Sequence, residues 1–140
     1  MLKAAKILIV DDDAANARLL ERMLRKADYG DVTTETDPRR VIDLCDEMEP
    51  DLLLLDLHMP GMDGFEVMEG LRQAEAERFL PILVLTGDTS VEVKRRALLV
   101  GAKDFLTKPV DHFELLLRIW NLLETRVLYL ELQRRKAAAD

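Results

Sequence analysis

Four places in the chain carry side chains that can bind a metal ion and a phosphoryl group. Asp11-Asp12-Asp13 follows one short apolar run, and Asp56 ends a run of four leucines. Thr86 and Lys108 each follow a later apolar run. Carboxylates brought together repel one another unless a cation lies among them, and Mg²⁺ is the hard divalent cation that oxygen ligands suit. The pattern therefore predicts a Mg²⁺ site.

The same residues have the chemistry for phosphoryl transfer to a carboxylate. Asp56 would attack phosphorus and form an acyl phosphate, with the metal ion offsetting the charge. Thr86 offers a hydroxyl and Lys108 an ammonium for the phosphoryl oxygens, and Gly87 allows a close approach of the backbone. Other interpretations stay open. The triplet from Asp11 would also cap a helix, which can be the whole role of its last member, and the threonine and lysine would suit a strand and a solvated surface.

Five short apolar runs, each followed by a longer stretch with helical spacing, must position these residues. Strands that are apolar throughout are typical of a parallel sheet covered by helices on both faces. We therefore predict a three-layer α/β/α fold, in which the carboxyl ends of the strands bring the polar residues to one edge. The predicted strands are Ile7 to Val10, Val32 to Thr34, Leu52 to Leu55, Ile82 to Leu85 and Phe105 to Thr107.

Capping residues indicate where several helices begin and end. Gly30 is placed to end the first helix. Asp37 followed by Pro38 predicts the start of a second helix that runs towards Met48. Ser90 is placed to cap the fourth helix. We therefore expect one helix after each strand.

Composition narrows the class of protein. The 140 residues, 49% of them hydrophobic, fit one domain with one core. The net charge of -7 leaves no broad basic surface, so we expect no direct nucleic-acid binding. Cys45 is the only cysteine, which excludes an internal disulfide and a cysteine-based zinc site and favours a reducing cytoplasm. The apolar runs fall far short of the ~20 residues of a membrane-spanning helix, so we expect no membrane span. We also expect no signal peptide.

Taken in order, these segments resemble the receiver domains of two-component response regulators, over nearly the whole chain up to about Leu123. The segments that carry the resemblance are Ile7-Leu8-Ile9-Val10-Asp11-Asp12-Asp13, Pro50-Asp51-Leu52-Leu53-Leu54-Leu55-Asp56 with Met59-Pro60-Gly61-Met62-Asp63-Gly64, Thr86-Gly87, and Phe105-Leu106-Thr107-Lys108-Pro109. One departure is glycine at position 87, where alanine is commonest. The resemblance implies a flavodoxin-like, five-stranded parallel sheet of order 2-1-3-4-5.

The resemblance implies that Asp56 is the phosphoacceptor and that Asp11, Asp12 and Asp56 hold Mg²⁺ together with the backbone carbonyl of His58. The imidazole of His58 is expected at the surface, as neither metal ligand nor phosphodonor. His58 and Asp88, each two residues beyond a key site residue, are expected to flank the entrance. Both side chains are therefore placed to affect the lifetime of the acyl phosphate.

The resemblance also implies a switch. Thr86 and Lys108 would bind the phosphoryl oxygens and take part in the chemistry. Phe105 would turn inward when Thr86 moves toward the phosphoryl group, and its ring would be held by packing because it has no hydroxyl. A static core phenylalanine is the alternative. A cis peptide is implied between Lys108 and Pro109.

The function implied is a phosphorylation-controlled interaction module and not a metabolic enzyme. A sensor histidine kinase would donate the phosphoryl group, and the domain would catalyse only its own phosphorylation and dephosphorylation. A Mg²⁺-dependent phosphohydrolase of the haloacid dehalogenase type also uses an aspartyl phosphate. It has Asp-x-Asp-x-Thr/Val on its first strand, where this chain has Ala15. A receiver-like adaptor that is never phosphorylated is the third alternative, and the presence of every expected site residue argues against it.

The last helix is expected to begin near Asp111 and to continue beyond Leu123. Apolar residues recur there with the spacing of a short coiled coil. They are Leu116, Trp120, Leu123, Val127 and Leu130. We divide the chain into a receiver domain, 1–123, and a helical extension, 124–140, that mediates homodimerisation or leads to an output module. A long helix that docks its second stripe on its own domain is the alternative.

Overall fold

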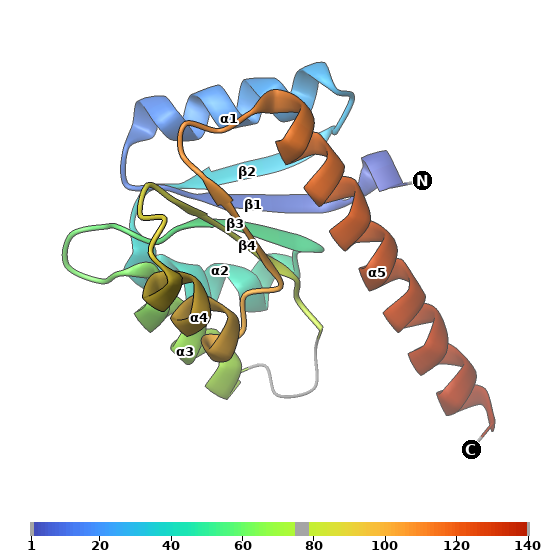
Figure 1. Ribbon diagram of the computed structural model, residues 1–140. Coiled ribbons are helices and arrows are strands. Elements are labelled where there is room, and N and C mark those ends of the chain that lie inside the picture. Colours follow the sequence, from blue (N-terminus) through green and yellow to red (C-terminus); the bar gives the residue numbers. More distant parts are fainter. Residues whose placement is uncertain (1, 75–78, 140) are drawn as a thin grey trace.

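The computed structural model describes residues 2–74 and 79–139, which form a parallel five-stranded sheet between two layers of helices (Figure 1). The strand order is β2-β1-β3-β4-β5. The fold class and the order expected from the resemblance are therefore confirmed. The strands are β1 Lys6–Val10, β2 Asp31–Glu35, β3 Leu52–Asp56, β4 Ile82–Thr86 and β5 Asp104–Thr107, each one or two residues longer than predicted.

Helices α2, α3 and α4 cover one face of the sheet, and α1 and α5 cover the other (Figure 1). The helices are α1 Ala14–Lys26, α2 Val41–Met48, α3 Gly64–Ala74, α4 Val91–Val100 and α5 His112–Ala139, with 3-10 helices at Leu2–Ala4 and Pro38–Arg40. No helix in the described ranges is both long enough and apolar enough to span a membrane.

Alternate residues of each central strand enter different cores. In β1, Ile7 and Ile9 pack with residues of α1 and α5, whereas Leu8 and Val10 pack with residues of α2 and α3. All four side chains are buried. Because side chains alternate across a strand, a strand covered on both faces needs apolar residues at every position. This explains the uninterrupted apolar runs in the sequence.

The predicted helix starts are confirmed, with one change. Ser90 Oγ accepts a hydrogen bond from Val93 N at 3.3 Å and caps α4. Asp13 Oδ1 accepts from Ala15 N at 2.9 Å and caps α1. Asp37 caps the 3-10 turn at Pro38–Arg40, and α2 follows directly and ends at Met48.

The predicted end of the first helix is wrong. Helix α1 stops at Lys26, and Asp28 takes the left-handed conformation with φ 73°, whereas Gly30 does not have a positive φ. Aspartate tolerates this conformation better than most residues because its short polar side chain bonds locally. Tyr29 N then donates to Leu24 O at 3.1 Å, and the buried Tyr29 ring closes the end of the helix.

Helix α5 packs on the sheet in its first half and projects beyond it in its second half (Figure 1). Asp111 Oδ1 accepts from Glu114 N at 2.9 Å, so the helix starts where the sequence predicts. Leu115, Ile119 and Leu122 are buried against the sheet. The long last helix is therefore confirmed.

Arg126 and Tyr129 attach the helix to the domain beyond its buried part. Arg126 Nε donates to Asp51 Oδ1 at 2.9 Å, and the same guanidinium donates to the carbonyl of Phe79. The ring of Tyr129 lies 5.1 Å from that of Phe79, centroid to centroid. The helix is thus attached to the residues that precede β3 and β4, at the end of the sheet where the strands begin.

The seven-residue pattern of α5 divides between two environments. Leu123 is buried in the domain's own core, and Leu116 packs against that core. Trp120, Val127 and Leu130 remain 40%, 41% and 44% exposed. Part of the coiled-coil spacing is therefore explained by packing within the chain, as the alternative interpretation expects, and part of it is left at the surface.

Candidate functional site

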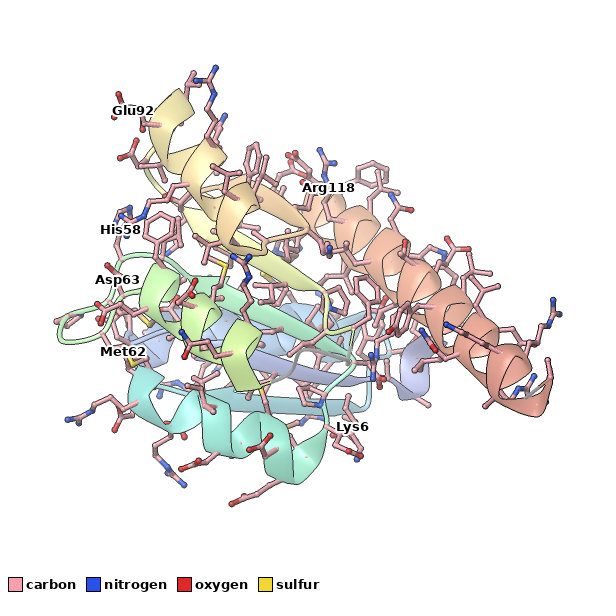
Figure 2. All side chains as sticks on the ribbon, turned by 90° about the horizontal axis from the view of Figure 1, so that it is seen from below. Lys6, His58, Met62, Asp63, Glu92 and Arg118 are labelled. Carbon is pink, nitrogen blue, oxygen red and sulfur yellow. The ribbon has the colours of Figure 1, made fainter. Side chains whose placement is uncertain are left out.

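The carboxyl ends of four strands bring the predicted site residues to one edge of the sheet. Asp11 follows β1, Asp56 and Thr86 end β3 and β4, and Lys108 follows β5. The register pairs Val10 with Leu55, Asp56 with Leu85, and Thr86 with Thr107, so the strand ends are level. Figure 2 shows His58 at this edge and Lys6, the first residue of β1, at the opposite edge.

Three carboxylates form an acidic cluster here, which consists of Asp11, Asp12 and Asp56. One carboxylate oxygen from each lies within 4.8 Å of the other two. Asp11 and Asp56 are only 1% and 4% exposed, whereas Asp12 is exposed. The backbone N–H of His58 donates to Asp56 Oδ1 at 3.3 Å. Two buried carboxylates therefore share one small volume.

The carboxyl group of Asp11 is poorly satisfied by the protein. Its Oδ1 accepts a hydrogen bond from Asp13 N at 3.0 Å, but its Oδ2 has no hydrogen-bond partner among the described residues. The pKa of Asp11 is raised from 3.8 to about 6, chiefly by burial. The charges of Asp56 and Asp12 also raise it, whereas the Asp13 N–H and the Lys108 charge lower it. A buried oxygen without a donor is uncommon, and a bound cation would satisfy it.

Lys108 supplies the positive charge that faces the cluster. Its Nζ lies 3.2 Å from Asp56 Oδ1 and 3.8 Å from Asp11 Oδ2. Its backbone N–H donates to the carbonyl of Thr86 at 2.8 Å, and the Lys108–Pro109 peptide is cis. One ammonium does not balance three carboxylates, so the cluster keeps a net negative charge. The ligand atoms that the three carboxylates offer are all oxygens. The residues therefore fit a hard divalent cation such as Mg²⁺.

The hydroxyl of Thr86 has two partners from neighbouring loops. Asp88 N donates to Thr86 Oγ1 at 3.0 Å, and His58 Nε2 lies 3.3 Å from the same oxygen. The sequence placed His58 at the entrance but missed this contact. Both histidine and aspartate stand two residues beyond a strand-end site residue, which is the one signal in the sequence that relates them.

Phe105 on β5 is half-buried against the core that α2, α3 and α4 cover. The ammonium of Lys94 in α4 lies 4.9 Å from the centroid of its ring. This distance is within the range of a cation–π interaction. The ring therefore has an apolar side toward the core and a charged neighbour toward solvent.

Two glycines near the site differ in what surrounds them. A Cβ at Gly64 would lie 2.8 Å from the carbonyl oxygen of Asp56 and 2.9 Å from Leu57 Cα. Only glycine therefore lets α3 begin against the end of β3, a requirement that the sequence did not reveal. A Cβ at Gly87 would meet no atom within 4 Å. The close approach expected at Gly87 is thus not an approach to other parts of the protein.

Comparison with known proteins decides the family, because the response regulator receiver domain matches residues 7–120. This chain is a member of the response regulator receiver domain family. The receiver is 38% identical over 135 residues to response regulator PleD of Caulobacter vibrioides. The aligned residues make up 96% of this chain and 30% of that protein. It is 39% identical to the cell cycle response regulator CtrA of Brucella ovis, over 81% of this chain and 48% of that protein. The receiver thus spans less than half of either relative.

Solved structures agree with the receiver fold. Chemotaxis protein CheY4 of Vibrio cholerae superposes with a TM-score of 0.79 at 34% identity, over 85% of this chain and 98% of that one. A response regulator described as putative from Chloroflexus aurantiacus gives 0.80 at 35% identity, over 86% of this chain and 98% of that one. The resemblance in the sequence is therefore confirmed, and the acidic cluster, Thr86 and Lys108 all lie inside the matched residues.

Proposed function

We propose that this receiver is a Mg²⁺-dependent phosphoacceptor switch in which Asp56 takes a phosphoryl group from a sensor histidine kinase. The observation that carries the proposal is the acidic cluster. The Oδ2 of Asp11, which accepts no hydrogen bond from the described residues, lies there beside Asp56, and the Lys108 ammonium faces both carboxylates. Asp11, Asp12 and Asp56, with the backbone carbonyl of His58, would hold Mg²⁺. When bound, Mg²⁺ supplies positive charge that offsets the cluster and the incoming phosphoryl oxygens.

Asp56 acts as the nucleophile. A carboxylate oxygen of Asp56 forms a bond to the phosphorus of a phosphohistidine on the kinase, and the phosphorus–nitrogen bond breaks. The electron pair of that bond stays on the imidazole, which takes up a proton as it leaves. The acyl phosphate that forms is later cleaved by water, which returns Asp56 to a carboxylate. The receiver thus catalyses only its own phosphorylation and dephosphorylation.

Lys108 and Thr86 bind the phosphoryl oxygens. Lys108 already contacts Asp56 Oδ1, so its ammonium needs only a small shift to reach an oxygen of a phosphoryl group on that side chain. Thr86 gives up its contact with His58 and donates its hydroxyl hydrogen to another phosphoryl oxygen. Phe105 then turns into the space that Thr86 leaves, which changes the surface formed by α4, β5 and α5. Phosphorylation acts by binding one of two conformations better than the other.

A groove beside the site gives a kinase access to it. The groove lies between α1 and the segment from Lys108 to Val110, and Asp11 borders it. Leu19 of α1 lines the groove and is exposed. An apolar side chain of the kinase next to its phosphohistidine can bury itself there. The groove thus supports a protein as phosphodonor.

Intact mass after incubation with Mg²⁺ and acetyl phosphate tests the proposal. We expect a gain of about 80 Da in the native chain, and no gain in Asp56→Asn or after removal of Mg²⁺. Asp13→Asn is the matched control, because Asp13 caps α1 and should leave the gain unchanged. A native chain that gains no mass and binds no beryllofluoride would instead be a constitutive adaptor. Binding of beryllofluoride without a mass gain would indicate a short-lived acyl phosphate.

We further propose that 1–123 is the receiver domain proper and that 124–140 is an extension through which two copies associate or an output module is attached. Trp120, Val127 and Leu130 support a second copy of the chain as occupant, because they stay exposed with the spacing of a helix pair. Light scattering at micromolar concentration, with and without beryllofluoride, tests the association. A monomeric mass in both states contradicts it and leaves attachment of an output module.

A further inference from the structure

The hydroxyl of Thr86 is held on the side of the loops that follow β3 and β4. Its Oγ1 accepts a hydrogen bond from Asp88 N at 3.0 Å and lies 3.3 Å from His58 Nε2. Neither contact involves Asp56. Thr86 is also buried, so few other groups are within its reach. The position of the hydroxyl is therefore fixed by one backbone N–H and one side chain.

The two contacts differ in how they respond to substitution. The bond from Asp88 N belongs to the backbone and can remain with any residue at position 88 except proline. The contact with His58 depends on an imidazole at position 58. A threonine hydroxyl has one donor hydrogen and two acceptor lone pairs, so it can bind Nε2 in either tautomer while accepting from Asp88 N. The His58 contact is thus the adjustable restraint on Thr86.

The imidazole reaches Thr86 from an exposed position. Residue 58 lies in the loop after β3, and its backbone N–H donates to Asp56 Oδ1 at 3.3 Å. The Asp88 carboxylate lies near the imidazole, and hydrogen bonds from Ser90, with a smaller effect of the His58 charge, hold the pKa of Asp88 below its ordinary value. His58 therefore contacts the Thr86 hydroxyl and lies within electrostatic range of the Asp88 carboxylate.

We propose that the His58 side chain is a positioning residue that holds the Thr86 hydroxyl in its unphosphorylated position and so opposes occupancy of the phosphoryl site on Asp56. This inference rests on the proposed function, because it requires Thr86 to bind a phosphoryl oxygen. When Thr86 moves toward the phosphoryl group, its Oγ1 leaves the hydrogen-bond distance of Nε2, so the contact with His58 breaks whichever of the two groups donates. The unphosphorylated state is therefore stabilised by one hydrogen bond that is absent when the phosphoryl site is occupied.

Beryllofluoride affinity in the presence of Mg²⁺ measures this effect, by titration calorimetry. His58→Phe keeps a planar ring without the nitrogen, and we expect it to bind beryllofluoride about two- to ten-fold more tightly than the native chain, the range of one net hydrogen bond. His58→Gln places an amide where Nε2 lies and should restore the native affinity. An unchanged or weaker affinity in His58→Phe overturns the proposal.

A double-mutant cycle separates this role from a change in shape at the entrance. In a Thr86→Val background there is no hydroxyl to hold, so His58→Phe should then leave beryllofluoride affinity unchanged. An equal gain in both backgrounds overturns the proposal. Methyl NMR couplings of Thr86 in the ligand-free chain give a second measurement, and His58→Phe should broaden its χ1 distribution where the native chain shows a single rotamer.

The two levels of failure can be told apart. If the native chain binds no beryllofluoride with Mg²⁺, the proposed function fails. If the native chain binds and Asp56→Asn does not, the proposed function stands. If His58→Phe then changes beryllofluoride affinity equally in the native and Thr86→Val backgrounds, only the role of His58 fails. The fold of each variant is checked by urea unfolding, which should remain a single cooperative transition. His58→Phe should lower its midpoint only by the loss of one hydrogen bond from an exposed side chain.

Discussion

Lys108 Nζ lies 3.2 Å from Oδ1 of Asp56, which is the proposed phosphoacceptor and one of the three carboxylates of the acidic cluster. In the metal-free protein the Lys108 ammonium partly neutralises the charge that Mg²⁺ would neutralise. The ammonium and the metal ion therefore compete for the same carboxylates, and the lysine has opposite effects on metal affinity and on phosphoryl transfer.

Lys108→Met should bind Mg²⁺ more tightly than the native chain and should be phosphorylated more slowly. Loss of a competing charge that is 30% exposed is expected to raise Mg²⁺ affinity about five-fold. Titration calorimetry measures the affinity, and the initial rate of mass gain with acetyl phosphate measures the transfer. A parallel fall in both quantities would contradict competition, since it would show that Lys108 supports the metal site.

Asp11→Asn should stabilise the metal-free protein at neutral pH. The pKa of Asp11 is raised to about 6 from 3.8, so between about pH 4 and 6 the folded chain binds more protons than the unfolded chain, and stability falls as pH rises through this window. Above about pH 6 the buried, ionised carboxylate lowers the free energy of unfolding by about 3 kcal/mol. The gain from asparagine is smaller than this, because its amide lacks hydrogen-bond partners at the same place.

Urea unfolding without metal checks this pH dependence. The gain of Asp11→Asn over the native chain should be ~1–3 kcal/mol at pH 7.5 and should shrink toward zero by about pH 4. Mg²⁺ should stabilise the native chain and not the variant, because ligand binding to the folded state alone raises stability. A gain that is the same at both pH values would place its origin outside the titration of Asp11.

The sequence identified the strands and the site edge because both depend on simple rules. Strands buried on two faces must be apolar throughout, and parallel strands place their carboxyl ends together. The position of a residue relative to its strand was therefore enough to predict which side chains meet at one edge of the sheet. They are Asp11, Asp56, Thr86 and Lys108. The end of α1 was mispredicted because the left-handed residue is Asp28, and glycine is only the commonest residue in that conformation.

Contacts that depend on rotamers or on the exact approach of two elements could not be predicted. The contact of His58 with Thr86 requires the conformations of two loops, and the need for glycine at position 64 appears only when α3 meets the end of β3. The heptad spacing of α5 has a different difficulty. Its pattern is the same whether a residue faces its own domain, as Leu123 does, or faces solvent, as Val127 does.

Gly64→Ala should destabilise the protein and disturb the site, whereas Gly87→Ala should do neither. A Cβ at position 64 would lie 2.8 Å from the Asp56 carbonyl oxygen, and backbone there cannot yield without moving the acceptor residue. We expect a cost of ~2–3 kcal/mol and a loss of Mg²⁺ affinity. Gly87→Ala has free space and should change stability by less than ~1 kcal/mol. Unfolding by urea and Mg²⁺ titration measure both, and equal effects of the two substitutions would refute the distinction.

Arg126 and Arg134 lie on the same helix in opposite environments. The side chain of Arg126 is 11% exposed and joins α5 to Asp51 and to the Phe79 carbonyl, whereas that of Arg134 is 75% exposed and pairs with Glu131 one turn earlier. Arg126→Leu should cost ~2 kcal/mol, since it removes charged hydrogen bonds from a shielded site. Arg134→Leu should stay within ~0.5 kcal/mol.

The same pair of variants tests whether the helix is fixed to the domain. In Arg126→Leu, backbone amides of α5 after residue 126 should exchange with solvent much faster, because the helix there has lost its main attachment to the sheet. In Arg134→Leu they should exchange at the native rate. Hydrogen exchange followed by mass spectrometry gives both rates. Unchanged protection in Arg126→Leu would mean that the rings of Phe79 and Tyr129, whose centroids are 5.1 Å apart, are enough to hold the extension in place.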